Sequence, residues 1–175
     1  KESPAPITFI HGKAGCGKDT AYKIMEKYAT EEISRFAFAD YLKYIAYQAG
    51  WDGVKDEKGR KFLVSLGKVI NQYNNNFFAK DLADDIQKMP GDKVITDLRF
   101  PREYHTVAKM LPHERIVLIK IFGRASDYGR TTDDVSERDI TEDDIGRCFD
   151  FIIYNSGSYD EFENNIKYIV KELNL

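Results

Sequence analysis

Residues 7–20 read ITFIHGKAGCGKDT, and this stretch decides the fold. The apolar run 7–10 predicts a short buried strand, and 12–18 form a glycine-rich loop that ends in Gly-Lys. Apolar residues between positions 21 and 28 then recur at the spacing of one helix face. A strand, a glycine-rich loop and a helix in this order predict a phosphate-binding loop, or P-loop.

Glycine lets the backbone of such a loop curl, so that successive N–H groups face an anion at the positive end of the helix dipole. The expected nucleotide-binding residues are Gly12, Lys13, Ala14, Gly15, Cys16, Gly17, Lys18, Asp19 and Thr20. Lys18 is also a catalytic candidate, because its mobile charge can follow the β- and γ-phosphates. The alternative is a tight turn before a helix, which the flanking periodicity argues against.

The position after Lys18 departs from the usual P-loop pattern. A Ser or Thr hydroxyl is expected there to contact Mg²⁺, but this chain has Asp19 followed by Thr20. A carboxylate is a hard oxygen ligand for Mg²⁺, and it also favours the first turn of a helix by its charge. Asp19 and Thr20 are therefore both candidate metal ligands.

Composition narrows the class of protein. The chain has 175 residues and a net charge of −3, which indicates one domain without the basic excess typical of nucleic-acid binding. Its two cysteines are far apart, as expected of free thiols in a reducing compartment. No apolar run approaches 18 residues. We expect a cytoplasmic protein with a small-molecule partner and no membrane or nucleic-acid partner, and a homodimer stays open.

Strand and helix patterns alternate along the rest of the chain. Further strands are expected at 34–39, 94–97, 115–122 and 149–154, and further helices at 40–49, about 62–70, 77–86, 101–111 and 159–173. This alternation predicts an α/β fold of three layers, a parallel sheet with helices on both faces. The strands are apolar without alternation, which fits burial on both sides.

In such a sheet, ligands bind outside the carboxyl ends of the strands. The loops after Ile10, Phe38, Ile95 and Phe122 should therefore lie along one edge. That placement gathers candidate site residues around one crevice: Lys18, Asp40, Lys43, Asp97, Arg99 and Arg124.

Asp97 ends an apolar strand, the position where a P-loop enzyme holds a metal-coordinating acid. The alternative is a cap for the helix that Pro101 begins. Arg99 follows, and a guanidinium there can bind two phosphate oxygens at once. Its alternative is a surface ion pair with a neighbouring acid.

The segment 123–147 is polar and predicts a lid. It carries Arg124, Arg130 and Arg138 without an apolar face. Phosphoryl transfer requires exclusion of water and neutralised charge, which a closing segment with arginines supplies. The alternative for each arginine is solvated surface.

Four segments together resemble the deoxynucleoside monophosphate kinases of bacteriophages and their bacterial relatives. They are GKDT at 17–20, FADYLK at 38–43, GWDG and KDE within 50–57, and TDLRFP at 96–101. The resemblance covers nearly the whole chain and is loosest over 104–147. It implies a P-loop nucleoside monophosphate kinase that transfers the γ-phosphate of ATP to a deoxynucleoside monophosphate with Mg²⁺.

The resemblance also implies roles for individual residues. Asp97 would be the acid near Mg²⁺, and Lys43, just after Asp40, would contact the acceptor phosphate together with Arg99. Residues 50–90 would be the acceptor-binding insertion and 123–147 the lid. Independently of the resemblance, four aromatic residues are candidate stacking surfaces for the base, although aromatic residues at helix spacing are more often core: Trp51, Tyr73, Phe77 and Phe78.

Two other functions stay open on the sequence alone. One is a P-loop kinase of another phosphorylated metabolite, such as phosphomevalonate, since a Gly-Lys-Asp loop also occurs there. The other is a nucleotide-binding module without catalysis. The Asn-Lys-x-Asp tetrapeptide typical of GTPase switches does not occur in the chain.

Overall fold

A computed structural model describes residues 5–123 and 138–175. The elements are β1 (Ile7–His11), α1 (Lys18–Tyr28), β2 (Ile33–Phe36), α2 (Phe38–Gln48), α3 (Glu57–Tyr73), α4 (Phe77–Lys88), β3 (Asp92–Leu98), α5 (Pro101–Met110), β4 (Ile116–Phe122), α6 (Glu142–Ile145), β5 (Phe151–Tyr154) and α7 (Tyr159–Leu173). None of the helices in this part of the chain is long and apolar enough to cross a membrane.

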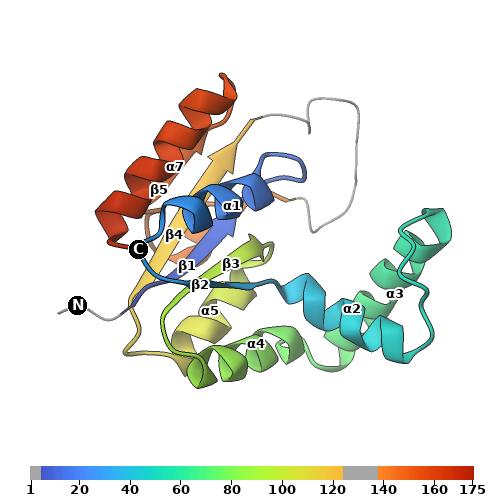
Figure 1. The fold of residues 1–175 in the computed structure, drawn as a ribbon. Helices are drawn as coiled ribbons and strands as arrows, with labels where there is room; N and C mark the ends of the chain where they lie inside the picture. Colours follow the sequence, from blue (N-terminus) through green and yellow to red (C-terminus); the bar gives the residue numbers. More distant parts are fainter. Residues whose placement is uncertain (1–4, 124–137) are drawn as a thin grey trace.

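The strands form one sheet in the order β2-β3-β1-β4-β5, and every pairing is parallel. Helices α1 and α7 cover one face, and α4, α5 and α6 cover the other (Figure 1). Alternate residues of β1 serve the two cores, since Ile10 packs with α1 and α7 whereas Phe9 packs with α4 and α5. The predicted three-layer α/β fold is confirmed, and the carboxyl ends of all five strands share one edge.

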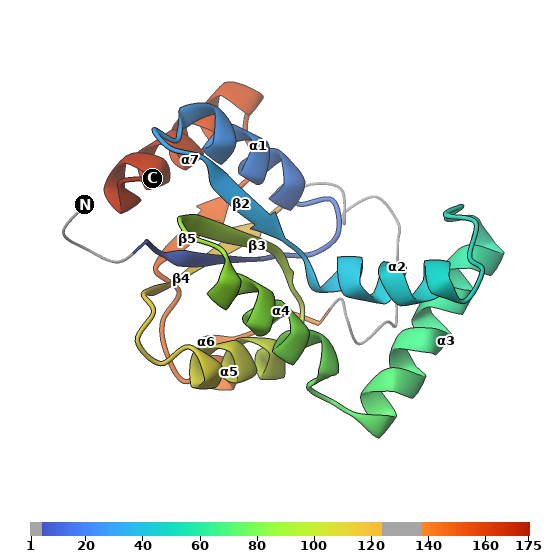
Figure 2. The same cartoon turned by 60° about the horizontal axis from the view of Figure 1, so that its bottom comes forward.

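Helices α2 and α3 project from the sheet as a pair (Figure 2). They pack closely where Gly67 of α3 faces Leu42 of α2, since an added Cβ would lie 3.4 Å from the Leu42 side chain. Helix α4 instead packs on the sheet and buries Leu82 and Ile86 in the core. The segment 50–90 therefore divides into a projecting part, α3 and the loop before it, and a core helix.

Helix α3 begins at Glu57, earlier than the predicted start at about 62, because Asp56 caps it by accepting a hydrogen bond from the Gly59 N–H. Two further elements differ from the sequence prediction. The strand expected over 34–39 ends at Phe36, because a helix begins at Phe38. The Asp97 carboxylate accepts hydrogen bonds from the N–H groups of Phe38 and Ala39, which stabilises that early start. Helix α6 was not predicted, since its four residues are too few to show a periodicity.

Candidate functional site

The loop between β1 and α1 needs glycine for two reasons. Gly15 and Gly17 have φ angles of 76° and 110°, in the left-handed region that glycine enters without steric cost. At Gly12, an added Cβ would lie 2.6 Å from the carbonyl oxygen of Ile121 in β4. The loop is thus a tightly curled backbone that lies against the end of the neighbouring strand.

Lys18 begins α1 and reaches back over this loop. Its Nζ donates to the carbonyl oxygens of Gly12 at 2.5 Å and Lys13 at 3.1 Å. Lys13, Ala14 and Gly15 are exposed, whereas the Cys16 side chain is buried beneath the loop. An anion bound at the loop would be contacted by backbone N–H groups. The Lys18 ammonium could bind the same anion by leaving the carbonyl oxygens of Gly12 and Lys13.

Asn155, immediately after β5, forms a hydrogen bond with the loop between β1 and α1. The sequence analysis did not select this residue. Its Nδ2 donates to the Cys16 carbonyl oxygen at 2.8 Å, and its side chain is buried. Its backbone N–H donates to the Phe122 carbonyl oxygen at 2.8 Å. An added Cβ on Gly17 would lie 2.9 Å from the same Nδ2. The only signal in the sequence is a polar residue at the end of an apolar strand.

Asp97 lies in β3 with 7% of its surface exposed. Its Oδ1 accepts from the Phe38 N–H at 2.8 Å and its Oδ2 accepts from the Ala39 N–H at 2.9 Å. Asp97 is therefore a cap, but of α2 rather than of the helix at Pro101. Burial raises the pKa of this carboxyl, and the Arg99 charge and the two N–H groups oppose that rise.

Asp19 and Thr20 are exposed at the start of α1. The Asp19 carboxylate lies 3.8 Å from the guanidinium of Arg35 in β2, a residue that the sequence analysis did not select. Arg35 also contacts Asp40 at 3.1 Å, and Asp40 lies 3.9 Å from the Lys43 ammonium. These ion pairs join the P-loop helix to the start of α2.

The donor set fits Mg²⁺ bound largely through nucleotide phosphates. Among the described residues no group of three or more His, Cys, Asp or Glu side chains could hold a metal ion. Mg²⁺ is commonly held by one or two carboxylates together with substrate phosphates and waters. Asp19 and Thr20 are open to such an ion, whereas both Asp97 oxygens already accept one backbone hydrogen bond.

A cluster of cations lies beside α2 and the end of β3. The pKa of Lys55 is lowered chiefly by the positive charge of Lys43, then by burial, and further by Arg99 and Arg60. The charges of the predicted Lys43 and Arg99 thus both act on Lys55, as does that of Arg60, and neither Lys55 nor Arg60 was selected as a site residue from the sequence. We call Lys43, Lys55, Arg60 and Arg99 the basic cluster.

Trp51 and Phe77 cannot serve one base together. Trp51 lies at the amino end of α3, where its Nε1 donates to the Val54 carbonyl oxygen at 3.2 Å and its ring packs 4.9 Å from that of Tyr47. Phe77 lies beyond the carboxyl end and packs against Phe78 at 5.3 Å. The 17 residues of α3 span about 25 Å, so a single base would contact at most one of the two rings.

Glu103 is a buried acid that supports Arg99 through the backbone. Its Oε1 accepts from the N–H groups of Arg99 at 2.9 Å and Phe100 at 2.8 Å. Burial, with a contribution from the Asp97 charge, raises the pKa of Glu103 to about 8. This acid fixes the turn between β3 and α5 from which the Arg99 side chain extends.

Two basic side chains, His11 and Lys120, form hydrogen bonds with the backbone of Ile140 next to β1. The Ile140 N–H donates to His11 Nε2 at 3.0 Å, and Lys120 donates to the Ile140 carbonyl oxygen at 2.7 Å and to Asp139 at 2.9 Å. His11 Nδ1 lies 2.7 Å from the Leu98 carbonyl oxygen, so the proton is on Nδ1. Burial is the main cause of the lowered pKa of His11.

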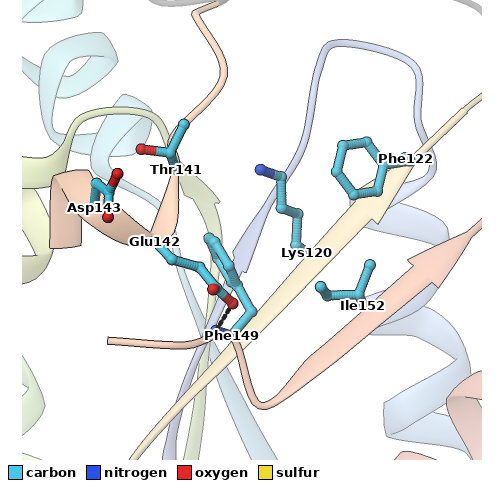
Figure 3. A pocket seen from close by; sticks show the side chains of 7 residues that line it. All are labelled: Lys120, Phe122, Thr141, Glu142, Asp143, Phe149 and Ile152. Atoms are coloured by element: carbon cyan, nitrogen blue, oxygen red, sulfur yellow. Dashed lines mark hydrogen bonds between the residues drawn. The ribbon is translucent and has the colours of Figure 1, made fainter. Parts of the chain in front are cut away.

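Beside Lys120 an open pocket of about 420 Å³ lies between α6 and the β4–β5 pair (Figure 3). Its lining residues are Lys120, Phe122, Thr141, Glu142, Asp143, Phe149 and Ile152. The Lys120 ammonium lies 4.8 Å and 5.1 Å from the ring centres of Phe122 and Phe149. Since its ammonium is held by Asp139 and Ile140, Lys120 acts here as a structural cation.

The lid arginines are only partly described. Arg124 and Arg130 lie outside the described residues. Arg138 is exposed, and its charge is one of the smaller causes of the lowered pKa of Asp144, after the hydrogen bonds from Thr141. The Arg138 charge thus acts on the carboxylate of Asp144 in α6.

Three comparisons place the chain among known proteins. No protein-family model matches it. It is 26% identical over 181 residues to UPF0200 protein MJ1399 of Methanocaldococcus jannaschii, covering 94% of this chain and 88% of that protein. An APS kinase, CysC of Mycobacterium tuberculosis in complex with AMPPNP and APS, matches with a TM-score of 0.58, 12% identity and coverage of 97% and 99%.

A putative kinase from Chloroflexus aurantiacus matches with a TM-score of 0.56 and 11% identity, covering 98% of this chain and 97% of that one. At these identities the likeness concerns the fold. It agrees with the three-layer α/β fold, in which the curled glycine loop lies between β1 and α1.

Proposed function

We propose that this protein transfers the γ-phosphate of ATP to a deoxynucleoside monophosphate. The observation that carries the proposal is a pair of cationic sites at one edge of the sheet. One is the P-loop with Lys18, at the end of β1, and the other is the basic cluster, at the end of β3 and on α2. Donor and acceptor phosphates both carry negative charge, so a transferase must supply cations on both sides.

Each residue has a definite task in this reaction. The loop N–H groups and Lys18 hold the donor phosphates, and Arg99 neutralises charge on the phosphoryl group as it moves. Lys43 holds the acceptor phosphate. Asp19, Thr20 and Asp97 are the residues that would orient Mg²⁺, which would offset the negative charge of the ATP phosphates. Arg124, Arg130 and Arg138 remain candidates for closing the site.

Two aromatic side chains, Trp51 and Phe77, are the candidates for stacking on the acceptor base. Trp51 is committed to its own loop through the Val54 carbonyl, and Phe77 packs on Phe78. Either ring would stack a base by its free face, but only one of them would do so in a given complex. Replacing each by leucine and comparing acceptor KM values identifies the ring that acts.

Two other functions would use the same geometry. A kinase of another phosphorylated metabolite, such as phosphomevalonate, needs the same two cationic sites and differs only in the acceptor. A nucleotide-binding module would use the P-loop alone and leave the basic cluster without a task. The cluster therefore favours a transferase with an anionic acceptor.

An acceptor screen tests the proposal. ADP release from ATP and Mg²⁺ is followed with each common deoxynucleoside monophosphate, each ribonucleoside monophosphate and phosphomevalonate. The proposal predicts turnover that depends on a deoxynucleoside monophosphate and disappears in Lys18→Ala. Turnover with phosphomevalonate alone would overturn the acceptor assignment. ATP binding without turnover for any acceptor would indicate the module.

A further inference from the structure

The peptide bond between Leu98 and Arg99 is held at both of its polar ends. The His11 ring donates from Nδ1 to the Leu98 carbonyl oxygen at 2.7 Å. The Arg99 N–H of the same peptide donates to Oε1 of Glu103 at 2.9 Å, and the Phe100 N–H donates to that oxygen at 2.8 Å. The peptide is trans, so its C=O and N–H point in opposite directions, and His11 and Glu103 hold it from opposite sides.

The hydrogen bond from His11 lies where the ladder between β1 and β3 is irregular. Phe9 of β1 pairs with Ile95 of β3. Two positions later in β1, His11 pairs with Leu98, which lies three positions along β3, so β3 carries one extra residue over this stretch. Such a β-bulge interrupts the regular ladder and redirects nearby side chains. The His11 side chain therefore fixes β3 at the end of the bulge, directly before Arg99.

The His11 ring is itself held in one orientation. It is buried, with 3% of its surface exposed, and it stacks on Phe149 with 6.3 Å between the ring centres. Its Nε2 accepts from the Ile140 N–H at 3.0 Å, and only a neutral ring with its proton on Nδ1 can make this bond and the bond to Leu98 together. Burial is the main cause of the lowered pKa of His11, which favours this neutral form.

His11 also adjoins the donor site. It is the last residue of β1, and Gly12, the first residue of the P-loop, follows it. Arg99 follows Leu98, the last residue of β3, and is exposed at the same edge of the sheet. One side chain therefore ties the backbone from which the P-loop begins to the backbone from which Arg99 extends.

We propose that His11 is a positioning residue for Arg99. Its neutral ring, opposite Glu103, fixes the Leu98–Arg99 peptide and thereby the direction in which the Arg99 side chain extends relative to the P-loop. This role rests on the proposed function, which gives Arg99 a phosphoryl group to neutralise. It goes beyond that function because His11 aligns Arg99 with the donor site without contacting a substrate.

Two substitutions separate the two hydrogen bonds of the ring. The asparagine nitrogen is two bonds from Cβ, as Nδ1 of histidine is, so His11→Asn can still donate to the Leu98 carbonyl oxygen but does not reach Ile140. The glutamine oxygen is three bonds from Cβ, as Nε2 of histidine is, so His11→Gln can still accept from the Ile140 N–H but leaves the Leu98 carbonyl oxygen without this donor. His11→Asn is therefore the matched control, since it keeps only the bond that positions Arg99.

Steady-state kinetics and thermal unfolding give opposite orders for the two variants. His11→Gln should lower kcat about tenfold or more, because Arg99 is misaligned with the moving group, while His11→Asn keeps most of the wild-type kcat. The ATP KM should be unchanged in both. His11→Asn should be destabilised at least as much as His11→Gln, because it is smaller and leaves the buried Ile140 N–H without its acceptor. A kcat that simply follows stability across the two variants would overturn the proposal.

A double-mutant cycle shows whether His11 acts through Arg99. In an Arg99→Ala background, the further change His11→Gln should alter kcat by less than about twofold, since the side chain that His11 positions is gone. The same loss in both backgrounds would overturn the proposal.

Amide exchange measured by NMR tests the contact without turnover. In His11→Gln the Leu98–Arg99 peptide loses one of its two anchors, so the Arg99 and Phe100 amides should exchange on the order of tenfold faster, relative to the buried Leu82 amide of α4. Unchanged relative exchange at Arg99 would overturn the proposal. Faster exchange there in a protein that transfers no phosphate would leave the hold of His11 on Arg99 standing and overturn the kinase assignment instead.

Discussion

Replacing Glu103 tests whether burial raises the pKa of this acid, which supports the turn that carries Arg99. In Glu103→Gln the amide oxygen can still accept from the N–H groups of Arg99 and Phe100, while the side chain stays neutral at every pH. Each pKa unit corresponds to about 1.4 kcal/mol. Because the pKa rises from its usual 4.5 to about 8, ionising Glu103 in the folded protein costs on the order of 5 kcal/mol relative to the unfolded chain.

The sign of the pH dependence follows from linkage. The pKa of Glu103 is raised on folding, so its contribution to stability is complete below about pH 4.5 and is lost as pH rises towards about 8. In that range the wild type should lose up to about 1.4 kcal/mol per pH unit from this group. Glu103→Gln lacks the loss, so its free energy of unfolding should exceed that of the wild type by a margin that grows with pH.

Urea unfolding of both proteins at about pH 5, 6.5 and 8 measures this margin, and taking the difference removes titrations common to both. Glu172→Gln, an exposed position on α7, is the control and should show no such trend. A margin that is constant across the three pH values would refute the reasoning. Activity should survive in Glu103→Gln, because the turn that carries Arg99 is retained.

The remaining predictions concern the phosphates, the metal and His11. Lys18→Ala should lower kcat on the order of 10²-fold or more while circular dichroism stays native, because a preorganised charge on the moving phosphate is lost; near-normal turnover would remove the P-loop from the account. Asp19→Asn should raise the Mg²⁺ concentration for half-maximal rate, since an exposed anionic ligand loses its charge; an unchanged Mg²⁺ dependence would leave Asp19 as a helix-start residue. Arg99→Lys should lower kcat, because lysine cannot bind two oxygens at once, and Lys43→Ala should raise the acceptor KM more than the ATP KM; equal effects on both KM values would place the acceptor phosphate elsewhere. The His11 ring should titrate by NMR with a midpoint below its usual 6.5, so that stability is held above about pH 6.5 and lost as pH falls towards the lowered pKa; a midpoint at or above 6.5 would contradict the buried neutral ring.

The sequence predicts the sheet and the P-loop because both depend on local patterns. Residues 7–20 contain the strand, the glycines and the start of the helix that make the loop, and the apolar runs are the buried strands. The boundary at Phe38 was misplaced because a residue 59 positions away, Asp97, caps the helix that begins there.

The supporting residues could not be found in this way, because their roles come from contacts between distant segments. Asn155 meets the P-loop across 139 positions of sequence, and the charges of Lys43 and Arg99 act on Lys55 only in the folded chain. Lys55 lies in the KDE segment that carries part of the family resemblance, but the sequence alone does not show which charges act on its side chain. Trp51 and Phe77 show the opposite case. Their aromatic side chains made both of them candidates in the sequence, but in the structure the length of α3 separates them.

Direct transfer of the γ-phosphate tests the central claim best. The protein is mixed with γ-labelled ATP, Mg²⁺ and each deoxynucleoside monophosphate, and the label is followed in the separated products for wild type and Lys18→Ala. We predict that label appears in a deoxynucleoside diphosphate with the wild type and that its rate falls on the order of 10²-fold or more in Lys18→Ala. Label found only in inorganic phosphate, or in the diphosphate at the same rate in both proteins, would contradict the account.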